Sequence, residues 1–221
     1  MKNRIHIVVT GSNKLTGKGI ARLLSQMGYF VSHLTNPGLP SLRRETSEPP
    51  HLIFITTTPA DRNESGTVLV LKTIYPGVPV VIITLDAGIN DIIRGIKAGV
   101  HGYLMTSIEP KELKAAVTAI TTNNDYFFDL SGERLMYSEK NDIKDPVRLM
   151  AAQHLPEPEK KVLALFCSEL SHEEIALKLQ YAPRTLAAYK ENICGALHFK
   201  SRVGLALFAL KNNLFGQDTF S

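Results

Sequence analysis

The sequence has no tryptophan and only two cysteines, Cys167 and Cys194, among its 221 residues. Two cysteines cannot build a disulfide framework, and neither has a second ligand at the spacing of a metal site. Each lies in an apolar stretch with helical spacing, so we expect both thiols to be reduced and to pack in the core. A small secreted protein held together by disulfides is therefore excluded.

The chain also lacks a long apolar run. No stretch approaches the length needed to cross a membrane, and the N-terminal residues lead into a strand rather than a signal peptide. We therefore expect a cytoplasmic protein with no membrane partner. The histidines are scattered, with no pair four residues apart, so we expect no metal and no cofactor. No nucleophile and base can be paired, which makes an enzyme the weakest functional class.

The composition is that of a globular protein, with 44% hydrophobic and 21% charged residues. The length suits one large domain or two ordinary ones. A net charge of +4 permits contacts with nucleic-acid phosphates without requiring them.

Short apolar stretches alternate with helical patterns through residues 1–125. Continuous apolar runs such as His51 to Thr56 and Val78 to Thr84 are typical of strands that are buried on both faces. Strands alternating with helices predict a parallel sheet with helices on both faces. We therefore predict an α/β doubly wound domain with a five-stranded parallel sheet. The strands are expected at 4–9, 29–33, 51–56, 78–84 and 102–105, and the helices at 19–27, 66–75, 89–98 and 110–121.

The alternating pattern ends near residue 125. Residues 126–153 are polar and rich in turn formers, as in the run from Glu139 to Pro146, and predict a linker. Residues 154–221 return to helical spacing and predict an all-α domain of four helices. In this domain Ser171 and Glu174 have the spacing of a capping box at the start of the second helix.

A short helix, a tight turn and a longer helix from Pro183 to Leu197 form the layout of a helix-turn-helix. In such a unit the second helix lies in the major groove of double-stranded DNA. Projecting this helix at about 100° per residue separates two faces. The predicted core face carries Leu186, Tyr189, Ile193 and Leu197. The opposite face and its flanks carry Arg184, Thr185, Ala187, Ala188, Lys190, Glu191, Asn192 and Gly195.

The C-terminal segment resembles the DNA-binding domain of NarL/LuxR-type response regulators. The residues that carry the resemblance are 155–163 (LPEPEKKVL), 170–179 (LSHEEIALKL), Thr185 and Leu186 with Ile193 and Leu197, and 200–203 (KSRV). The resemblance implies a four-helix domain that binds double-stranded DNA, often as a dimer through its last helix. The implied DNA-binding residues are Arg184, Thr185, Ala187, Ala188, Lys190, Glu191, Lys200 and Arg202.

The outward face of this helix departs from the family pattern. Ala187, Ala188 and Glu191 stand where the family commonly places lysine or other polar residues. Alanine can contact a thymine methyl group, and Glu191 can accept a hydrogen bond from cytosine. Residues 151–221 hold eight Lys/Arg and seven Asp/Glu, so the domain is nearly neutral. The remaining candidates for phosphate contacts are Arg184, Lys190, Lys200 and Arg202.

The N-terminal domain resembles the receiver domain of the same regulators, through Asn13 to Leu15, Tyr75 to Thr84 and Ala98 to Leu104. Receivers bind Mg²⁺ with an acidic pair, accept phosphate on an aspartate and place a lysine after the fifth strand. In this chain the corresponding positions hold Gly11 and Ser12 for the acidic pair, Thr56 for the acceptor and Thr106 for the lysine. Thr84 and Tyr103, the hydroxyl residues of the family's switch, are retained.

These replacements predict a degenerate pseudo-receiver without aspartyl-phosphate chemistry, because no carboxylate remains to bind magnesium or to accept phosphate. We predict a DNA-binding transcriptional regulator that works independently of phosphorylation. A homodimer is expected, joined through residues 102–121 or through the final helix. The alternative is an interaction module that docks another regulator protein and binds DNA weakly or not at all.

Two further possibilities concern the N-terminal domain. The glycine-rich stretch from Thr10 to Gly19 follows a strand, but it has neither the phosphate-loop spacing nor the dinucleotide glycine pattern. Threonines at the carboxyl ends of the strands could line a polar pocket for a small ligand, where open α/β sheets bind ligands. That pocket stays open as a hypothesis.

Overall fold

The structure is a computed structural model that describes residues 4–35, 48–58, 64–130 and 133–215. The chain divides into two compact units. One comprises residues 1–87 and 98–136, and the other comprises residues 88–97 and 137–221. The first unit is built around a β-sheet, and the second is built from helices.

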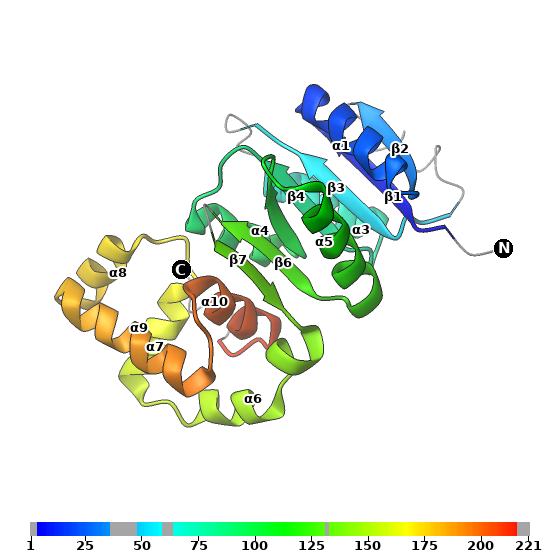
Figure 1. Ribbon diagram of the computed structural model, residues 1–221. Coiled ribbons are helices and arrows are strands. Elements are labelled where there is room, and N and C mark those ends of the chain that lie inside the picture. Colours follow the sequence, from blue (N-terminus) through cyan, green and yellow to red (C-terminus); the bar gives the residue numbers. More distant parts are fainter. Residues whose placement is uncertain (1–3, 36–47, 59–63, 131–132, 216–221) are drawn as a thin grey trace. The chain divides into compact units, whose positions relative to one another are not determined.

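The sheet has seven strands in the order β2-β1-β3-β4-β5-β6-β7 (Figure 1). The pairs from β2 through to β6 are parallel, so the predicted doubly wound α/β fold is confirmed. The bounds of the strands are β1 His6–Gly11, β2 Phe30–Thr35, β3 Leu52–Thr56, β4 Val80–Thr84, β5 Gly102–Met105, β6 Tyr126–Leu130 and β7 Glu133–Tyr137. Strands β3 and β4 are buried along their whole length, as their continuous apolar sequences predict.

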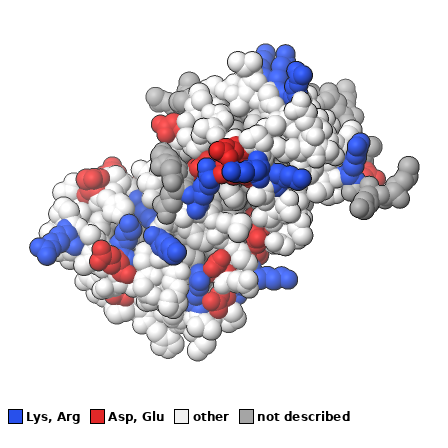
Figure 2. Space-filling view, in the orientation of Figure 1, with Lys and Arg blue, Asp and Glu red and all other residues white. Residues whose placement is uncertain are grey.

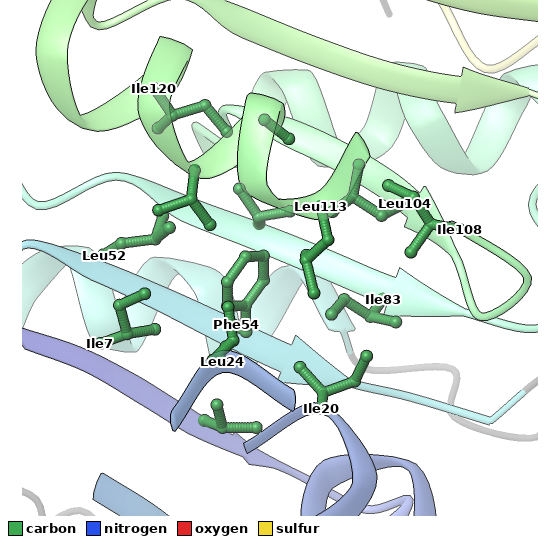
Figure 3. Packing of buried hydrophobic residues seen from close by; sticks show 14 of the residues in the cluster. Ile7, Ile20, Leu24, Leu52, Phe54, Ile83, Leu104, Ile108, Leu113 and Ile120 are labelled. Carbon is green, nitrogen blue, oxygen red and sulfur yellow. The ribbon is translucent and has the colours of Figure 1, made fainter. Parts of the chain in front are cut away.

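Two helices, α1 Lys14–Gln26 and α5 Pro110–Asn123, contribute to one core cluster with the strands. Figure 3 shows Phe54 at the centre of this cluster, between Leu24 of α1 and Leu113 of α5. Helix α1 begins at Lys14, earlier than the predicted Gly19, because the side chain of Asn13 accepts a hydrogen bond from the backbone N–H of Thr16 at 3.2 Å. The other helices of this half of the chain are α3 Glu64–Ile74 and α4 Ile89–Ala98.

The prediction of a linker over residues 126–153 is wrong, and the sheet has seven strands where five were predicted. Tyr126, Phe127 and Phe128 are buried, and β6 pairs with β5. Gly102 makes this pairing possible, since a Cβ at that position would overlap the carbonyl oxygen of Phe127. Asp129 looked like a loop residue in the sequence, yet it is buried in β6.

The second unit contains a short π-helix and five α-helices after residue 137. Their bounds are η1 Glu139–Ile143, α6 Pro146–Gln153, α7 Glu157–Phe166, α8 His172–Leu179, α9 Pro183–Leu197 and α10 Arg202–Lys211. Helices α7 to α10 form the predicted four-helix domain. Contacts from η1 extend the unit beyond the predicted boundary at residue 154, because the carbonyl of Ile143 accepts a hydrogen bond from the Asn212 amide at 2.7 Å.

Helix α10 is enclosed from Arg202 to Ala209. A Cβ at Gly204 would lie 2.7 Å from the hydroxyl oxygen of Tyr137, and that hydroxyl also contacts Ser201 at 2.9 Å. Among the described residues no single helix is long and apolar enough to cross a membrane. The bent pair α9 and α10 passes the same test on length and composition alone.

Candidate functional site

Local sequence signals fix the helix-turn-helix. Ser171 and Glu174 form the predicted capping box at the start of α8, with Glu174 N–H donating to the Ser171 hydroxyl at 3.1 Å. The helix ends at Gln180, whose φ of 55° reverses the chain. Pro183 then begins α9, where its missing N–H costs nothing. The turn therefore sets the position of α9 within the second unit.

The outward face of α9 is largely the face that the helical projection predicts. Leu186, Ile193 and Leu197 are buried. Lys190 is half-buried, so its ammonium group is less available than that of a fully exposed lysine. The exposed DNA-binding candidates are Arg184, Thr185, Ala187, Ala188 and Glu191 on α9, and Lys200 in the loop that follows.

Tyr189 departs from its predicted place in the core. Its ring is half-exposed and stacks on Tyr181 of the turn, with the ring centroids 5.4 Å apart. Leu177 of α8 also lies outside the core, with 77% of its surface exposed. Because α8 is only eight residues long, its buried side is narrow and holds Ile175 and Ala176.

The prediction that Arg202 contacts DNA phosphates is wrong, because the side chain is 2% exposed. Its Nε donates to the carbonyl of Phe166 at 3.0 Å, and its Nη2 donates to the carbonyls of Ser168 and Leu170 at 3.0 and 2.9 Å. The guanidinium thus satisfies the free carbonyls that follow α7. Burial lowers the pKa of Arg202 to about 10, partly offset by the nearby Cys167.

The receiver-like positions meet at the carboxyl edge of the sheet in the first unit. Gly11 is in register with Thr56, and the backbone N–H of Thr106 donates to the carbonyl of Thr84 at 2.9 Å. Ser12 follows directly on β1. Parallel strands carry their ligand sites at this edge, so the sequence placed these residues correctly relative to one another.

Thr56 is not available at this edge, because it is 1% exposed and already hydrogen-bonded. Its hydroxyl donates to the carbonyl oxygens of Thr10 and Asn13 at 3.2 and 3.1 Å. Gly11 has a φ of +127°, and a Cβ there would overlap the carbonyl oxygen of Thr56. Position 11 therefore cannot hold the aspartate that a receiver would place there without the strand ends moving apart.

Gly17 of α1 and His33 of β2 also cover the Thr56 hydroxyl, which sequence reasoning did not foresee. A Cβ at Gly17 would lie 3.2 Å from the Thr56 hydroxyl oxygen and 2.8 Å from His33 Nε2. The glycine thus lets the first turns of α1 approach the end of β3 closely. The available signal was the glycine-rich stretch from Thr10 to Gly19, because glycines there allow a close approach of the backbone.

The two retained hydroxyl residues both lie within the protein. Tyr103 on β5 is 2% exposed, and the Thr84 hydroxyl donates to the carbonyl of Asp86 at 3.0 Å. The hypothesis of a polar pocket lined by these threonines receives no support from Thr56 or Thr84, because both hydroxyls are satisfied by backbone carbonyls.

Both predicted dimer surfaces are covered in part. Strand β5 lies between β4 and β6, so its edge is paired within the chain. Helix α10 is buried over most of its length by its own unit. Of the residues predicted to join two copies, the exposed side of α5, with Lys114, Ala115 and Thr118, remains accessible.

Comparison with known proteins finds similarity both to the C-terminal segment and to nearly the whole chain. Residues 153–209 match the sequence model of the bacterial regulatory proteins of the luxR family. The response regulator protein VraR of Staphylococcus saprophyticus is 22% identical over 211 residues, which covers 95% of this chain and 98% of VraR. The uncharacterized transcriptional regulatory protein YhcZ of Bacillus subtilis is 25% identical over 214 residues, covering 96% and 98% of the two chains.

Solved structures of response regulators also align along the chain. A structure of the RcsB response regulator of Salmonella typhimurium gives a TM-score of 0.46 at 17% identity and covers 96% of this chain and 98% of that one. A structure of two RcsB dimers bound to two parallel DNAs gives a TM-score of 0.49 at 17% identity, with 95% and 99% covered.

The luxR-family match and the similarity to VraR and YhcZ confirm the resemblance to NarL/LuxR-type response regulators. The chain is thus similar to response regulators along its length, and its residues 153–209 match the luxR family of bacterial regulatory proteins.

Proposed function

We propose that this protein regulates transcription by binding double-stranded DNA through α9, and that it does so without phosphorylation, as a homodimer. The observation that carries the proposal is the state of Thr56, which stands at the acceptor position with its hydroxyl buried and hydrogen-bonded. The retained helix-turn-helix supports the DNA-binding part of the proposal.

Three features of the edge site argue against phosphoryl transfer. Thr56 lacks a carboxylate, and its hydroxyl donates to two backbone carbonyl oxygens. Gly11 and Ser12 offer no carboxylate to Mg²⁺, and Gly11 has no room for one. Thr106 supplies no positive charge to neutralise a transferred phosphoryl group. A receiver's magnesium therefore does not fit the residues present.

The DNA-binding part rests on the exposed face of α9. Arg184 lies in its first turn, where groove-reading helices contact DNA, and Lys200 follows its end. Ala187 and Ala188 leave space for the major-groove edges of the bases and can contact thymine methyl groups. With few cations on this face, the affinity contributed by α9 should be modest.

Phosphorylation independence is tested by incubating the full chain with acetyl phosphate, or with beryllofluoride, in the presence of Mg²⁺. We expect no mass increase and no change in oligomeric state or in DNA affinity. A response regulator with an intact acidic pair and acceptor aspartate, treated in parallel, shows that the reagents are active. A stoichiometric phospho-adduct would refute this part of the proposal.

DNA binding is tested by fluorescence polarisation at low salt, with duplex fragments taken from around the protein's own gene. We expect binding that Arg184→Ala weakens, by about 1 kcal/mol or more if the side chain contacts a base edge. Lys161→Ala, which removes an exposed charge from α7, is the matched control and should change little. Absence of binding at micromolar protein would refute the DNA-binding function.

Dimerisation is proposed because a receiver that cannot be switched by phosphate must already hold the arrangement that binds DNA. Sedimentation of the full chain measures it directly. A monomer at tens of micromolar protein would contradict this part of the proposal. If sedimentation shows a dimer, glutamate substitutions at Ala115 and Thr118 test whether the exposed side of α5 forms its interface. Dissociation into folded monomers would locate the interface there.

A further inference from the structure

The positive charge of this protein is concentrated at its N-terminus. Residues 1–44 contain seven Lys/Arg and no Asp or Glu, and the first carboxylate of the chain is Glu45. The remaining 177 residues hold 18 Lys/Arg against 21 Asp/Glu. The net charge of +4 therefore comes entirely from the first 44 residues, although that region contains none of the predicted DNA-binding residues.

Helix α1 presents part of this charge as a stripe. Lys14, Lys18 and Arg22 are all exposed and follow one another at intervals of four residues, so they lie on one side of the helix. At about 1.5 Å per residue, successive cations are about 6 Å apart and the stripe is about 12 Å long. Figure 2 shows Lys and Arg side chains gathered at the top of the view, over α1, without Asp or Glu among them.

The stripe is not neutralised within the described part of the chain, where none of its three residues forms an ion pair. The basic environment extends to β2, since the proximity of Lys18 adds to the larger effect of burial in lowering the pKa of His33. By contrast, the exposed lysines of α5 alternate with carboxylates, as Lys111 does with Glu109 at 3.0 Å.

We propose that the stripe Lys14–Lys18–Arg22 on α1 is a second, sequence-independent contact surface for the phosphate backbone of double-stranded DNA. A linear row of evenly spaced cations complements a rod that carries regularly spaced phosphates. The proposal rests on the proposed function in one respect, because it takes DNA as the ligand.

The near-neutral second unit explains why such a surface would matter. The accessible cations on α8, α9 and the loop that follows are Lys178, Arg184 and Lys200, with Lys190 half-buried. Glu173 and Glu174 of α8 and Glu191 of α9 are exposed and repel phosphates. Phosphate neutralisation supplies most of the non-specific affinity for DNA, and the α1 stripe offers three cations in a region without carboxylates, so it should add to that affinity.

A membrane surface fits the stripe less well. Membrane-bound amphipathic helices insert an apolar face, but the apolar face of α1, with Ile20 and Leu24, is buried against the sheet. Leu15, with 84% of its surface exposed, is the one large apolar side chain that the helix offers to solvent. A single leucine provides little apolar area for insertion.

The test measures binding of the full chain to a labelled random-sequence duplex of about 20 base pairs between about 50 and 200 mM salt. We expect the triple variant K14Q/K18Q/R22Q to weaken binding about tenfold or more at the lowest salt. The slope of log Kd against log salt should fall by about two to three, near one for each lost contact. The control K97Q/K140Q/K161Q removes the same charge from exposed positions elsewhere and should leave both quantities nearly unchanged.

Other outcomes separate this inference from the proposed function. If the triple variant K14Q/K18Q/R22Q binds the random duplex as tightly as the wild type, the inference is overturned. In that case R184A still tests the proposed function, because a loss of preference for genomic fragments would show that α9 contacts the bases. Equal affinity of the wild type for genomic and random duplexes would refute sequence reading by α9 and would leave the proposal for the α1 stripe unaffected. Polyglutamate and phosphatidylglycerol vesicles serve as probes for an acidic protein and for a membrane. If the chain binds either probe more tightly than duplex DNA, and the triple variant loses that binding, the inference is overturned.

Discussion

Thr56 ends β3 with a hydroxyl whose hydrogen-bonding needs are met by two backbone carbonyls. Arg202 meets three carbonyls in the second unit in the same way. Both residues occupy positions where the family carries function or where charge suggests a DNA contact, and both are buried. Their local hydrogen bonds give each of them a structural role that single substitutions can measure.

Thr56→Asp is predicted to destabilise the protein rather than restore phosphorylation. A carboxylate has no hydrogen to donate, so at this buried position it would face the carbonyl oxygens of Thr10 and Asn13 unpaired. We expect the free energy of unfolding to fall by about 3 kcal/mol or more, because an unpaired charge would be buried. Thr56→Ser keeps the hydroxyl and should cost less than about 1.5 kcal/mol. Urea denaturation measures both; a Thr56→Asp variant of wild-type stability would contradict this account.

Arg202→Met is predicted to lower the free energy of unfolding by about 2–4 kcal/mol, because three carbonyls lose their donor. Under conditions where the variant is folded, its DNA affinity and its salt dependence should be unchanged. The neighbouring exposed Lys200 provides the comparison. Lys200→Met should leave stability within about 0.5 kcal/mol and reduce the salt slope by about one if Lys200 contacts phosphate. A reduced salt slope in Arg202→Met would show that the arginine reaches DNA after all.

At the scale of elements, the strands β6 and β7 cover the edge of β5, so that edge cannot pair with a second copy of the chain. They lengthen the sheet beyond β5, and His101 stacks on Tyr126 with the ring centroids 5.1 Å apart. The hairpin is further attached by an ion pair between Arg134 and Glu112 of α5. A sheet edge that would otherwise expose unpaired backbone groups at β5 is thereby satisfied within the chain.

Phe128→Ala therefore tests whether residues 126–137 belong to the folded unit. Phe128 is fully buried, and removing its ring should cost about 3–5 kcal/mol of unfolding free energy. Met136 is 60% exposed in β7, so Met136→Ala should change stability by about 0.5 kcal/mol or less. Thermal or urea denaturation distinguishes the two variants. If both were neutral, the segment would be the linker that the sequence suggested.

At the scale of the whole molecule, charge is unevenly distributed between the α1 region and the rest of the chain. Three histidines from different parts of the chain have pKa values that their surroundings lower. Burial is the largest cause of the lowered pKa of His6, His33 and His172, and neighbouring residues add to it, His51 at His6 and Lys18 at His33. For His172, Arg202 and Lys190 lower the pKa while Glu173 raises it.

These lowered pKa values predict that the protein loses stability on acidification. Above about pH 6.5 the three imidazoles are neutral in both states, and below it the unfolded chain takes up protons first. The free energy of unfolding should therefore fall as the pH drops from about 6.5 towards the lower folded-state pKa values, and should level off below them. Urea midpoints at about pH 7.5 and about pH 5.5 measure this. Glutamine variants of the three histidines should narrow the difference; equal stability at both pH values would contradict the prediction.

The sequence by itself determined the doubly wound fold, the four-helix domain and the arrangement of α9. Continuous apolar runs in β3 and β4 and the signals at Ser171 and Pro183 depend on local chemistry, which a single sequence displays directly. The loss of the receiver's carboxylates was equally visible, because it depends on residue identity at positions already placed by the strand pattern.

Only the tertiary structure decided which of those residues are accessible. The sequence predicts Asp129 and Arg202 to be polar surface residues, but both are buried. Their hydrogen-bond partners lie on segments that are distant in the sequence. The same holds for Thr56, which Gly11 and Gly17 cover by close backbone approach. Burial is a property of packing between elements, and periodicity within one element does not contain it. The sequence therefore determined the fold of both units and the resemblance to response regulators, and the tertiary structure determined which of the charged side chains are accessible.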